Sequence, residues 1–105
     1  LPLARATLAA VRRSRGDADA ALAPAREAMA TLESSGGVET GEALVRLELA
    51  RALAATGAAT EATHAFDDAE RQLVGRARRI RQPEHRRSFL ERVPENADTI
   101  AKRIR

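Results

Sequence analysis

The sequence predicts an all-α fold built from repeated helix pairs, and two observations carry that prediction. Good helix formers dominate, and Phe66 and Phe89 are the only aromatic residues in 105, so the core must consist of Leu, Val, Ile and Ala. The second observation is an internal repeat. The stretch "GDADAALAPAREAM" from Gly16 and the stretch "GAATEATHAFDDAE" from Gly57 share one frame, 41 positions apart. A fixed period of this size is typical of stacked helical units.

The repeat extends beyond these two stretches, because aligning the chain with itself at an offset of 41 gives identities along both predicted pairs. They are Leu3/Leu44, Arg5/Arg46, Leu8/Leu49, Ala9/Ala50, Gly16/Gly57, Ala18/Ala59, Ala21/Ala62, Ala28/Ala69 and Leu32/Leu73. The Gly and Leu identities keep the same frame as the Ala identities. We therefore expect an antiparallel helix-pair solenoid with two repeats, at about residues 3–34 and 40–81, within residues 1–82.

The first helix is expected over about residues 3–15, with Ala4, Leu8 and Val11 on one face. Gly16 and Asp17 then break it. The Asp17 carboxylate can cap the next helix by accepting a bond from one of its free N–H groups.

The second helix is expected from an apolar stripe that ends near the "SSGG" loop of residues 34–37. The stripe consists of Ala21, Leu22, Ala25, Ala28, Met29 and Leu32. Pro24 lies inside it, and an interior proline removes a backbone bond and crowds the preceding turn. We expect a local kink, with Pro24 facing solvent.

The second pair follows the same plan, with a helix over about Thr40–Thr56 that Gly57 ends. The next helix should run through Gly75 to about Arg81, because one stripe continues along it: Ala62, Phe66, Ala69, Leu73, Ala77 and Ile80. Small residues at the paired Ala positions let neighbouring helix backbones approach closely. The larger Phe66 fills the space between them.

Residues 83–105 are predicted to form two short C-terminal capping helices that begin at Pro83 and Pro94. The first carries Phe89 and Leu90. In the second, the residues expected to share one face are Ala97, Ile100, Ala101 and Ile104.

Charge is distributed unevenly: residues 1–70 carry −4, residues 71–105 carry +7, and the net charge is +3. The candidate basic patch consists of Arg71, Arg76, Arg78, Arg79, Arg86 and Arg87. It could contact phosphates, which makes a basic helical module on nucleic acid the alternative function. No aromatic residues alternate with these arginines to stack bases, so the solvated face of a helix is the favoured interpretation.

The sequence offers little for catalysis, and we expect neither an enzyme nor a metal or other cofactor. Cys and Tyr are absent, which leaves Ser14, Ser34, Ser35 or Ser88 as nucleophiles and His64 or His85 as bases. His64 precedes Asp68 by four residues and could bond to it, but an ordinary exposed contact is the favoured interpretation. Gly36-Gly37 lacks the Lys and the spacing of a phosphate loop.

The pattern of the repeat resembles the tetratricopeptide (TPR) repeat family. Leu8-Ala9 and Leu49-Ala50 match its first helix, Gly16 and Gly57 its turn, and the Ala–aromatic–Ala order around Phe66 its second helix. The departures are Ala25 in the aromatic position of the first unit, Arg5 and Arg46 where the family has a large residue, and a period of 41 that exceeds the usual length. Residues 78–96 resemble the end of such arrays in large bacterial signalling proteins, such as multidomain Ser/Thr kinases and ATPase-type regulators.

This resemblance implies a protein–protein interaction module, the C-terminal part of a longer sensor or scaffold array in a bacterial signalling or regulatory protein. A protein or peptide ligand would lie in a concave groove lined by Ala10, Arg13, Ser14, Glu48, Arg51 and Ala55. The clamp that uses Asn on this surface in some family members is not expected, because the only Asn is Asn96. We also expect a cytoplasmic location, no membrane partner and self-association through the N-terminal helix, with the chain excised from a longer protein.

Overall fold

The computed structural model describes residues 2–36 and 41–102. Over these residues it is helical without any strand, which confirms the all-α prediction. The elements are α1 (Pro2–Ser14), α2 (Ala18–Ser34), α3 (Glu42–Ala55), α4 (Ala59–Ala77), α5 (Pro83–Arg92) and α6 (Pro94–Ile100). The predicted starts at Pro83 and Pro94 are confirmed, while Gly37 and Thr40 lie outside the described residues.

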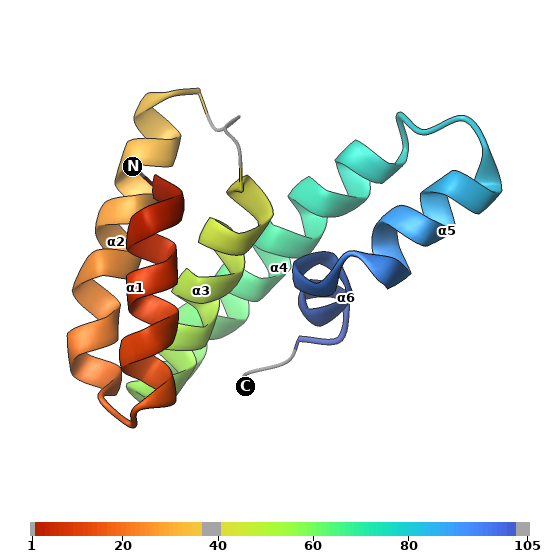
Figure 1. The fold of residues 1–105 in the computed structure, drawn as a ribbon. Coiled ribbons are helices and arrows are strands. Elements are labelled where there is room, and N and C mark those ends of the chain that lie inside the picture. Colours follow the sequence, from red (N-terminus) through yellow and green to blue (C-terminus); the bar gives the residue numbers. More distant parts are fainter. Residues whose placement is uncertain (1, 37–40, 103–105) are drawn as a thin grey trace.

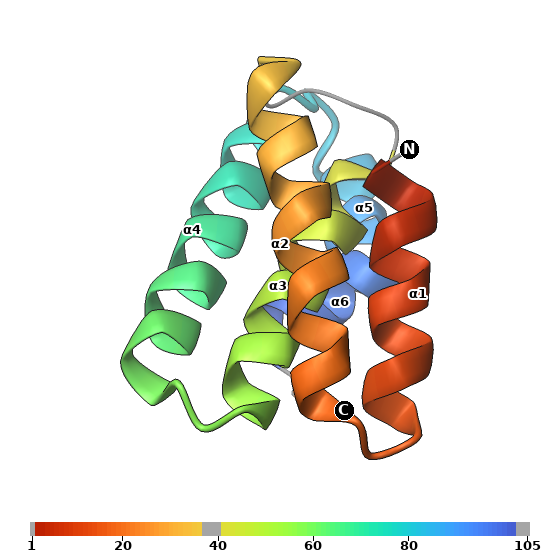
Figure 2. The same cartoon turned by 90° about the vertical axis from the view of Figure 1, so that its left-hand side faces the viewer.

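Helix α3 is the centre of the molecule. It packs against α1 and α2 on one side and against α4 and α6 on the other. Viewed as in Figure 1, α3 lies between α1 and α6. Figure 2 shows α4 and α1 at the two sides of the molecule, with α2 in front of α3 between them. Nearly every side of α3 is therefore covered, and its buried residues point in all directions around the helix.

The sequence repeat corresponds to a repeated core. Ala21, Ala28 and Leu32 of α2 are buried, and so are their counterparts Ala62, Ala69 and Leu73 of α4. Two positions differ in size, since the first pair has Ala6 and Ala25 where the second has Leu47 and Phe66. All four are buried, and Leu47 and Phe66 belong to one cluster with Ala50. The predicted role of Phe66 as a core residue is confirmed.

The helix ends also repeat. Gly16 and Gly57 follow α1 and α3 with φ of +80° and +85°, a conformation that side chains disfavour. The Asp17 carboxylate accepts a hydrogen bond from the backbone N–H of Ala20 at 3.2 Å, as predicted for a capping residue. Helix α4 passes through Gly75 as expected but ends at Ala77, so Ile80 is half-buried in the connection rather than part of the predicted stripe.

The prediction that Pro24 faces solvent is wrong, because Pro24 is buried on the same side as Ala21, Ala25 and Ala28. An interior proline leaves the carbonyl four residues earlier without its helical partner, which here is the carbonyl of Ala20. The Arg12 guanidinium donates to that oxygen at 3.1 Å. A side chain of α1 thus replaces the missing backbone bond, and the apolar proline ring can be buried.

The apolar stripe predicted for the first helix is not its packed face. Helix α1 buries Pro2, Ala6 and Ala9, whereas Ala4, Leu8 and Val11 are exposed. Small residues allow α1 to lie close to α2 and α3. The larger apolar side chains of α1 are left on the outside.

The face predicted for the last helix is also wrong, because α6 buries Asn96 and Thr99 while Ile100 and Ala101 are exposed. Asn96 donates to the carbonyl of Phe89 at 3.0 Å, and the Thr99 hydroxyl donates to the carbonyl of Glu95 at 2.7 Å. Both polar side chains can be buried because backbone carbonyls satisfy them. Ile104 lies outside the described residues.

Candidate interaction surfaces

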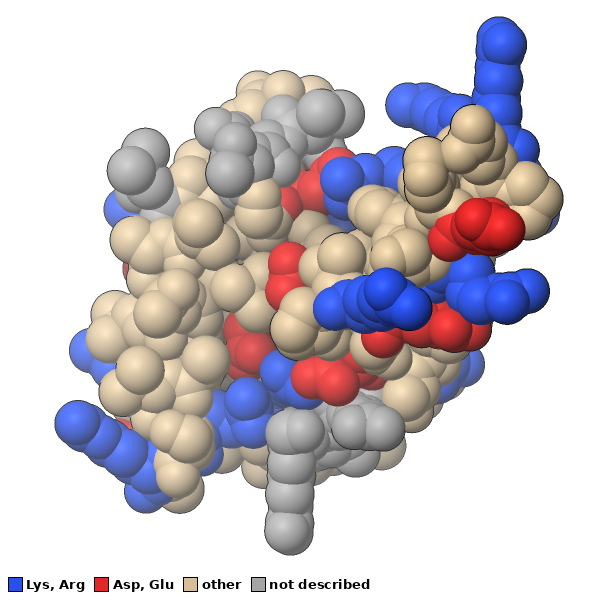
Figure 3. Space-filling model, turned by 45° about the vertical axis from the view of Figure 1, so that its right-hand side comes forward, with Lys and Arg blue, Asp and Glu red and all other residues tan. Residues whose placement is uncertain are grey.

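A chain of ion pairs crosses α3 and links α1 to α6. Arg13 of α1 lies 3.2 Å from the Glu48 carboxylate of α3, and Arg51 of α3 lies 3.0 Å from the other oxygen of Glu48. Arg51 also reaches Asp98 of α6 at 2.8 Å. Figure 3 shows red and blue side chains side by side in the middle of this view of the molecule.

Of the six predicted groove residues, Arg13, Glu48 and Arg51 meet, and Glu48 is only 2% exposed. Ser14 does not join them, since it is exposed and donates to the carbonyl of Val11 at 2.8 Å. Sequence reasoning missed Asp98. It lies 47 residues after Arg51, on a short helix whose docking position no local pattern specifies.

This pairing limits what the α3 part of the face can bind. A charged group of a partner would have to displace an internal partner of Glu48 or Arg51, and leaving a buried charge unpaired costs about 3–5 kcal/mol. Two members of the predicted groove, Ser14 and Ala55, are exposed and are called its rim below. The rim is therefore more accessible to a partner than the paired charges between α1 and α6.

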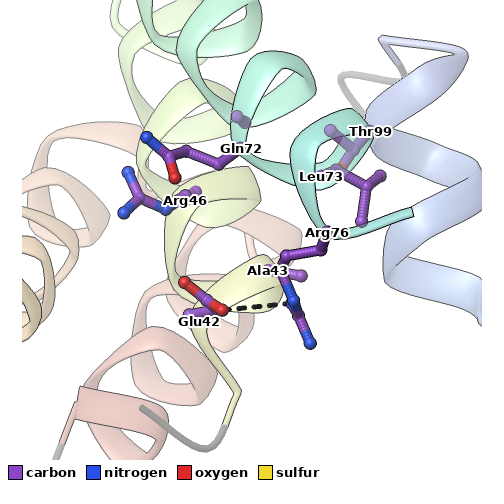
Figure 4. A pocket seen from close by; sticks show the side chains of 8 residues that line it. Glu42, Ala43, Arg46, Gln72, Leu73, Arg76 and Thr99 are labelled. Atoms are coloured by element: carbon purple, nitrogen blue, oxygen red, sulfur yellow. Dashed lines mark ion pairs between the residues drawn. The ribbon is translucent and has the colours of Figure 1, made fainter. Parts of the chain in front are cut away.

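A second cluster joins α3, α4 and α5. Arg76 of α4 lies 3.2 Å from the buried Glu42 carboxylate, and its guanidinium carbon lies 5.4 Å from the centre of the Phe89 ring. Figure 4 shows this pair beside a cavity into which Thr99 and Leu73 project. The cavity measures about 10 Å³, room for about one water molecule rather than a cofactor.

The candidate basic patch divides into two groups of three. Arg71 pairs with Asp68 at 3.4 Å, Arg76 pairs with Glu42, and Arg86 donates to the Ile80 carbonyl through Nε at 3.2 Å and Nη2 at 2.8 Å. Arg78, Arg79 and Arg87 are exposed, and so are Arg71 and Arg76 despite their ion pairs; only Arg86 is half-buried. Basic side chains at the right of Figure 3 alternate with acidic ones instead of forming a continuous surface.

An ion pair repeats together with the core. Arg5 of α1 lies 3.7 Å from Glu27 of α2, and Arg46 of α3 lies 3.1 Å from Asp68 of α4, with both residues offset by 41. Arg46 is buried, and its Nε–H finds no acceptor among the described residues. Sequence reasoning noted the Arg5/Arg46 identity but not the partner, although the acidic pair Glu27/Asp68 keeps the same offset.

The residues considered for catalysis lie apart on the surface. His64 and His85 are exposed, and Asp68 pairs with Arg46 and Arg71. The Ser34 and Ser35 hydroxyls donate to the carbonyl of Thr31 at 2.8 and 2.9 Å. Within residues 2–36 and 41–102, no group of three or more His, Asp or Glu side chains is placed to hold a metal ion.

In the part of the chain that the structure describes, no helix is long and apolar enough to cross a membrane. Comparisons of the chain with protein-family models, with curated proteins and with solved structures find no match.

Proposed function

We propose that the chain is a protein–protein interaction module of the tetratricopeptide kind, the C-terminal part of a longer helix-pair array in a bacterial signalling or regulatory protein. The observation that carries this proposal is the chemical repeat. Core positions, turn glycines and the Arg–acid pair recur at an offset of 41. An isolated catalytic domain has no physical need for such periodicity, whereas a stacked array does.

The proposed ligand is a protein or peptide that lies along the α1–α3–α6 face. The pairs of Glu48 with Arg13 and of Arg51 with Asp98 link α3 to α1 and to α6. A preformed surface loses less conformational entropy on binding than a mobile one. The rim residue Ser14 would contact the ligand, and the paired charges would keep the shape of the face.

A matched pair of substitutions tests this proposal. Ser14 and Ser34 are the last residues of α1 and α2, both exposed, and each donates to the carbonyl three residues earlier at 2.8 Å. Ser14→Arg should block the face and abolish retention of the proteins that the immobilised wild type captures from a nuclease-treated bacterial lysate. Ser34→Arg should retain them, and equal retention by both variants would contradict the proposed site.

Contact with nucleic acid through Arg78, Arg79 and Arg87 is the alternative. Fluorescence anisotropy at physiological salt should show only weak duplex binding that does not depend on sequence and falls steeply as salt rises. Tight binding with strong discrimination between sequences, lost in Arg79→Glu, would favour the alternative.

A further inference from the structure

Helix α1 leaves an apolar strip uncovered. Leu3, Leu8 and Val11 are 38%, 41% and 41% exposed, and Ala4 beside them is exposed as well. Their counterparts in α3, in the same frame of the repeat, are Leu44, Val45, Leu49 and Ala52. Val45 and Ala52 are completely or almost completely buried, and Leu44 and Leu49 are half-buried.

The structure shows what covers the counterparts. Val45 belongs to one cluster with Ala28 and Leu32 of α2. Ala52 belongs to another with Ala21 and Ala25 of α2, and Leu49 packs against that cluster. The second helix of the preceding pair thus covers this side of α3.

The repeated ion pair agrees with this comparison. The side chains of Arg5 and Glu27 are 47% and 61% exposed, whereas that of Arg46, the counterpart of Arg5, is 9% exposed. Met29 and Glu33 of α2 line the same groove as Arg46. The difference between the two arginines therefore comes from α2 beside α3, and no corresponding helix covers Arg5 among the described residues.

We propose that the strip formed by Leu3, Ala4, Leu8 and Val11 receives the second helix of a preceding helix pair, packed as α2 packs on α3. This inference rests on the proposed array and specifies its docking site. The docked helix would carry small residues at the spacing of Ala21, Ala25 and Ala28, followed by a leucine four residues later. The docked helix would also bury the side chain of Arg5.

A second copy of this chain cannot supply the docked helix from its own α2 or α4. Its α2 already packs on its own α3, and its α4 lies against α6, with Thr99 beside Ala69 and Leu73, the counterparts of Ala28 and Leu32. The matching surface of a second copy is therefore covered where docking would need it.

A tandem chain tests the docking site. Residues 1–41 are placed before Leu1 of the intact chain, so that the added second helix precedes α1 at the natural offset. Urea unfolding should remain one cooperative transition with a higher midpoint, and the m-value should rise about 1.4-fold, in proportion to the added length. A separate, earlier transition that leaves the original midpoint unchanged would overturn the proposal.

Two matched variants of the tandem locate the contact. Leu8→Glu in the internal copy should lower the folding equilibrium constant about 100-fold, because it places a charge in the new interface. The same substitution in the added outer copy, whose strip stays exposed, should change it less than about threefold. Equal effects of the two would overturn the proposal. Partner retention by the original chain tests the proposed function separately, since it does not require a docked unit.

Discussion

Helices α1 and α3 begin their helix pairs in the same frame, yet their surroundings differ. Their inner faces agree: Ala6 and Ala9 are buried in α1, as Leu47 and Ala50 are in α3. The opposite faces of the two helices differ in burial: Thr7 of α1 is exposed, whereas its counterpart Glu48 of α3 is only 2% exposed. The inner face depends on the helix that follows in the same pair, whereas the outer face depends on neighbours from elsewhere in the chain.

The comparison explains why α3 can carry charges inside the molecule. Glu48 and Arg51 are buried because α1 and α6 supply Arg13 and Asp98 on either side. Among the described residues, α1 packs against α2 and α3 alone, and its Thr7 and Ala10, the counterparts of Glu48 and Arg51, bear no charge. Substitutions at matched positions of the two units should therefore have unequal effects.

The largest effect is expected at the core position where the units differ most in size. Phe66→Ala should lower the free energy of unfolding by about 3–5 kcal/mol, because it empties a buried aromatic site next to Leu47 and Ala50. Urea unfolding measures the loss, and a value below about 1 kcal/mol would contradict the burial of Phe66. The counterpart Ala25→Phe should destabilise by about 1–3 kcal/mol, since Ala25 is completely buried and has no room for a ring.

The second-largest loss of stability is expected at the buried carboxylate of Glu48. Glu48→Ala should cost about 3 kcal/mol, because Arg13 and Arg51 lose a shared partner inside the fold. Thr7→Ala, its matched control in α1, should stay within about 0.5 kcal/mol, as expected for an exposed position. Similar unfolding midpoints for the two variants would mean that the ion pairs between α1 and α6 add nothing to stability.

The repeated ion pair should show a smaller difference. Arg46→Ala should cost about 1–2 kcal/mol, since it removes buried packing and a pair with Asp68 but also an Nε–H without an acceptor among the described residues. Arg5→Ala should cost at most about 1 kcal/mol, because its pair with Glu27 is exposed to solvent. Thermal unfolding of both variants in low and high salt provides the measurement. A larger cost at Arg5 would reverse the comparison.

The substitution Leu8→Glu should change the stability of the fold least and the self-association of the chain most. The exposed strip on α1 should make the wild type self-associate at micromolar concentration. Leu8→Glu should restore the monomer in sedimentation equilibrium with little effect on folding. Leu49→Glu, the matched substitution in α3, should destabilise the fold instead. A wild type that stays monomeric at millimolar concentration would show that the strips of two copies do not pair with each other.

Much of the fold could be predicted locally. The turn glycines, the Asp17 cap and the prolines that start α5 and α6 depend on backbone requirements of one or two residues. The stripe from Ala62 to Ala77 was correct because α4 has one packed side. The prediction for Pro24 was wrong because its burial depends on the Arg12 guanidinium, a side chain of another helix. The face predicted for α6 was wrong because nearby backbone carbonyls satisfy Asn96 and Thr99, so these polar side chains can be buried in place of the apolar ones.

The sequence by itself determined the helical class, the period and most of the inward-facing stripe of α2 and α4, because these follow from helix geometry and side-chain size. The resemblance to the tetratricopeptide repeat implied that Arg13, Glu48 and Arg51 share one face. Only the tertiary structure decided that they pair with one another and with Asp98, and which apolar strip stays open. Burial and charge pairing depend on which other helix lies beside a position, and no local spacing specifies that neighbour.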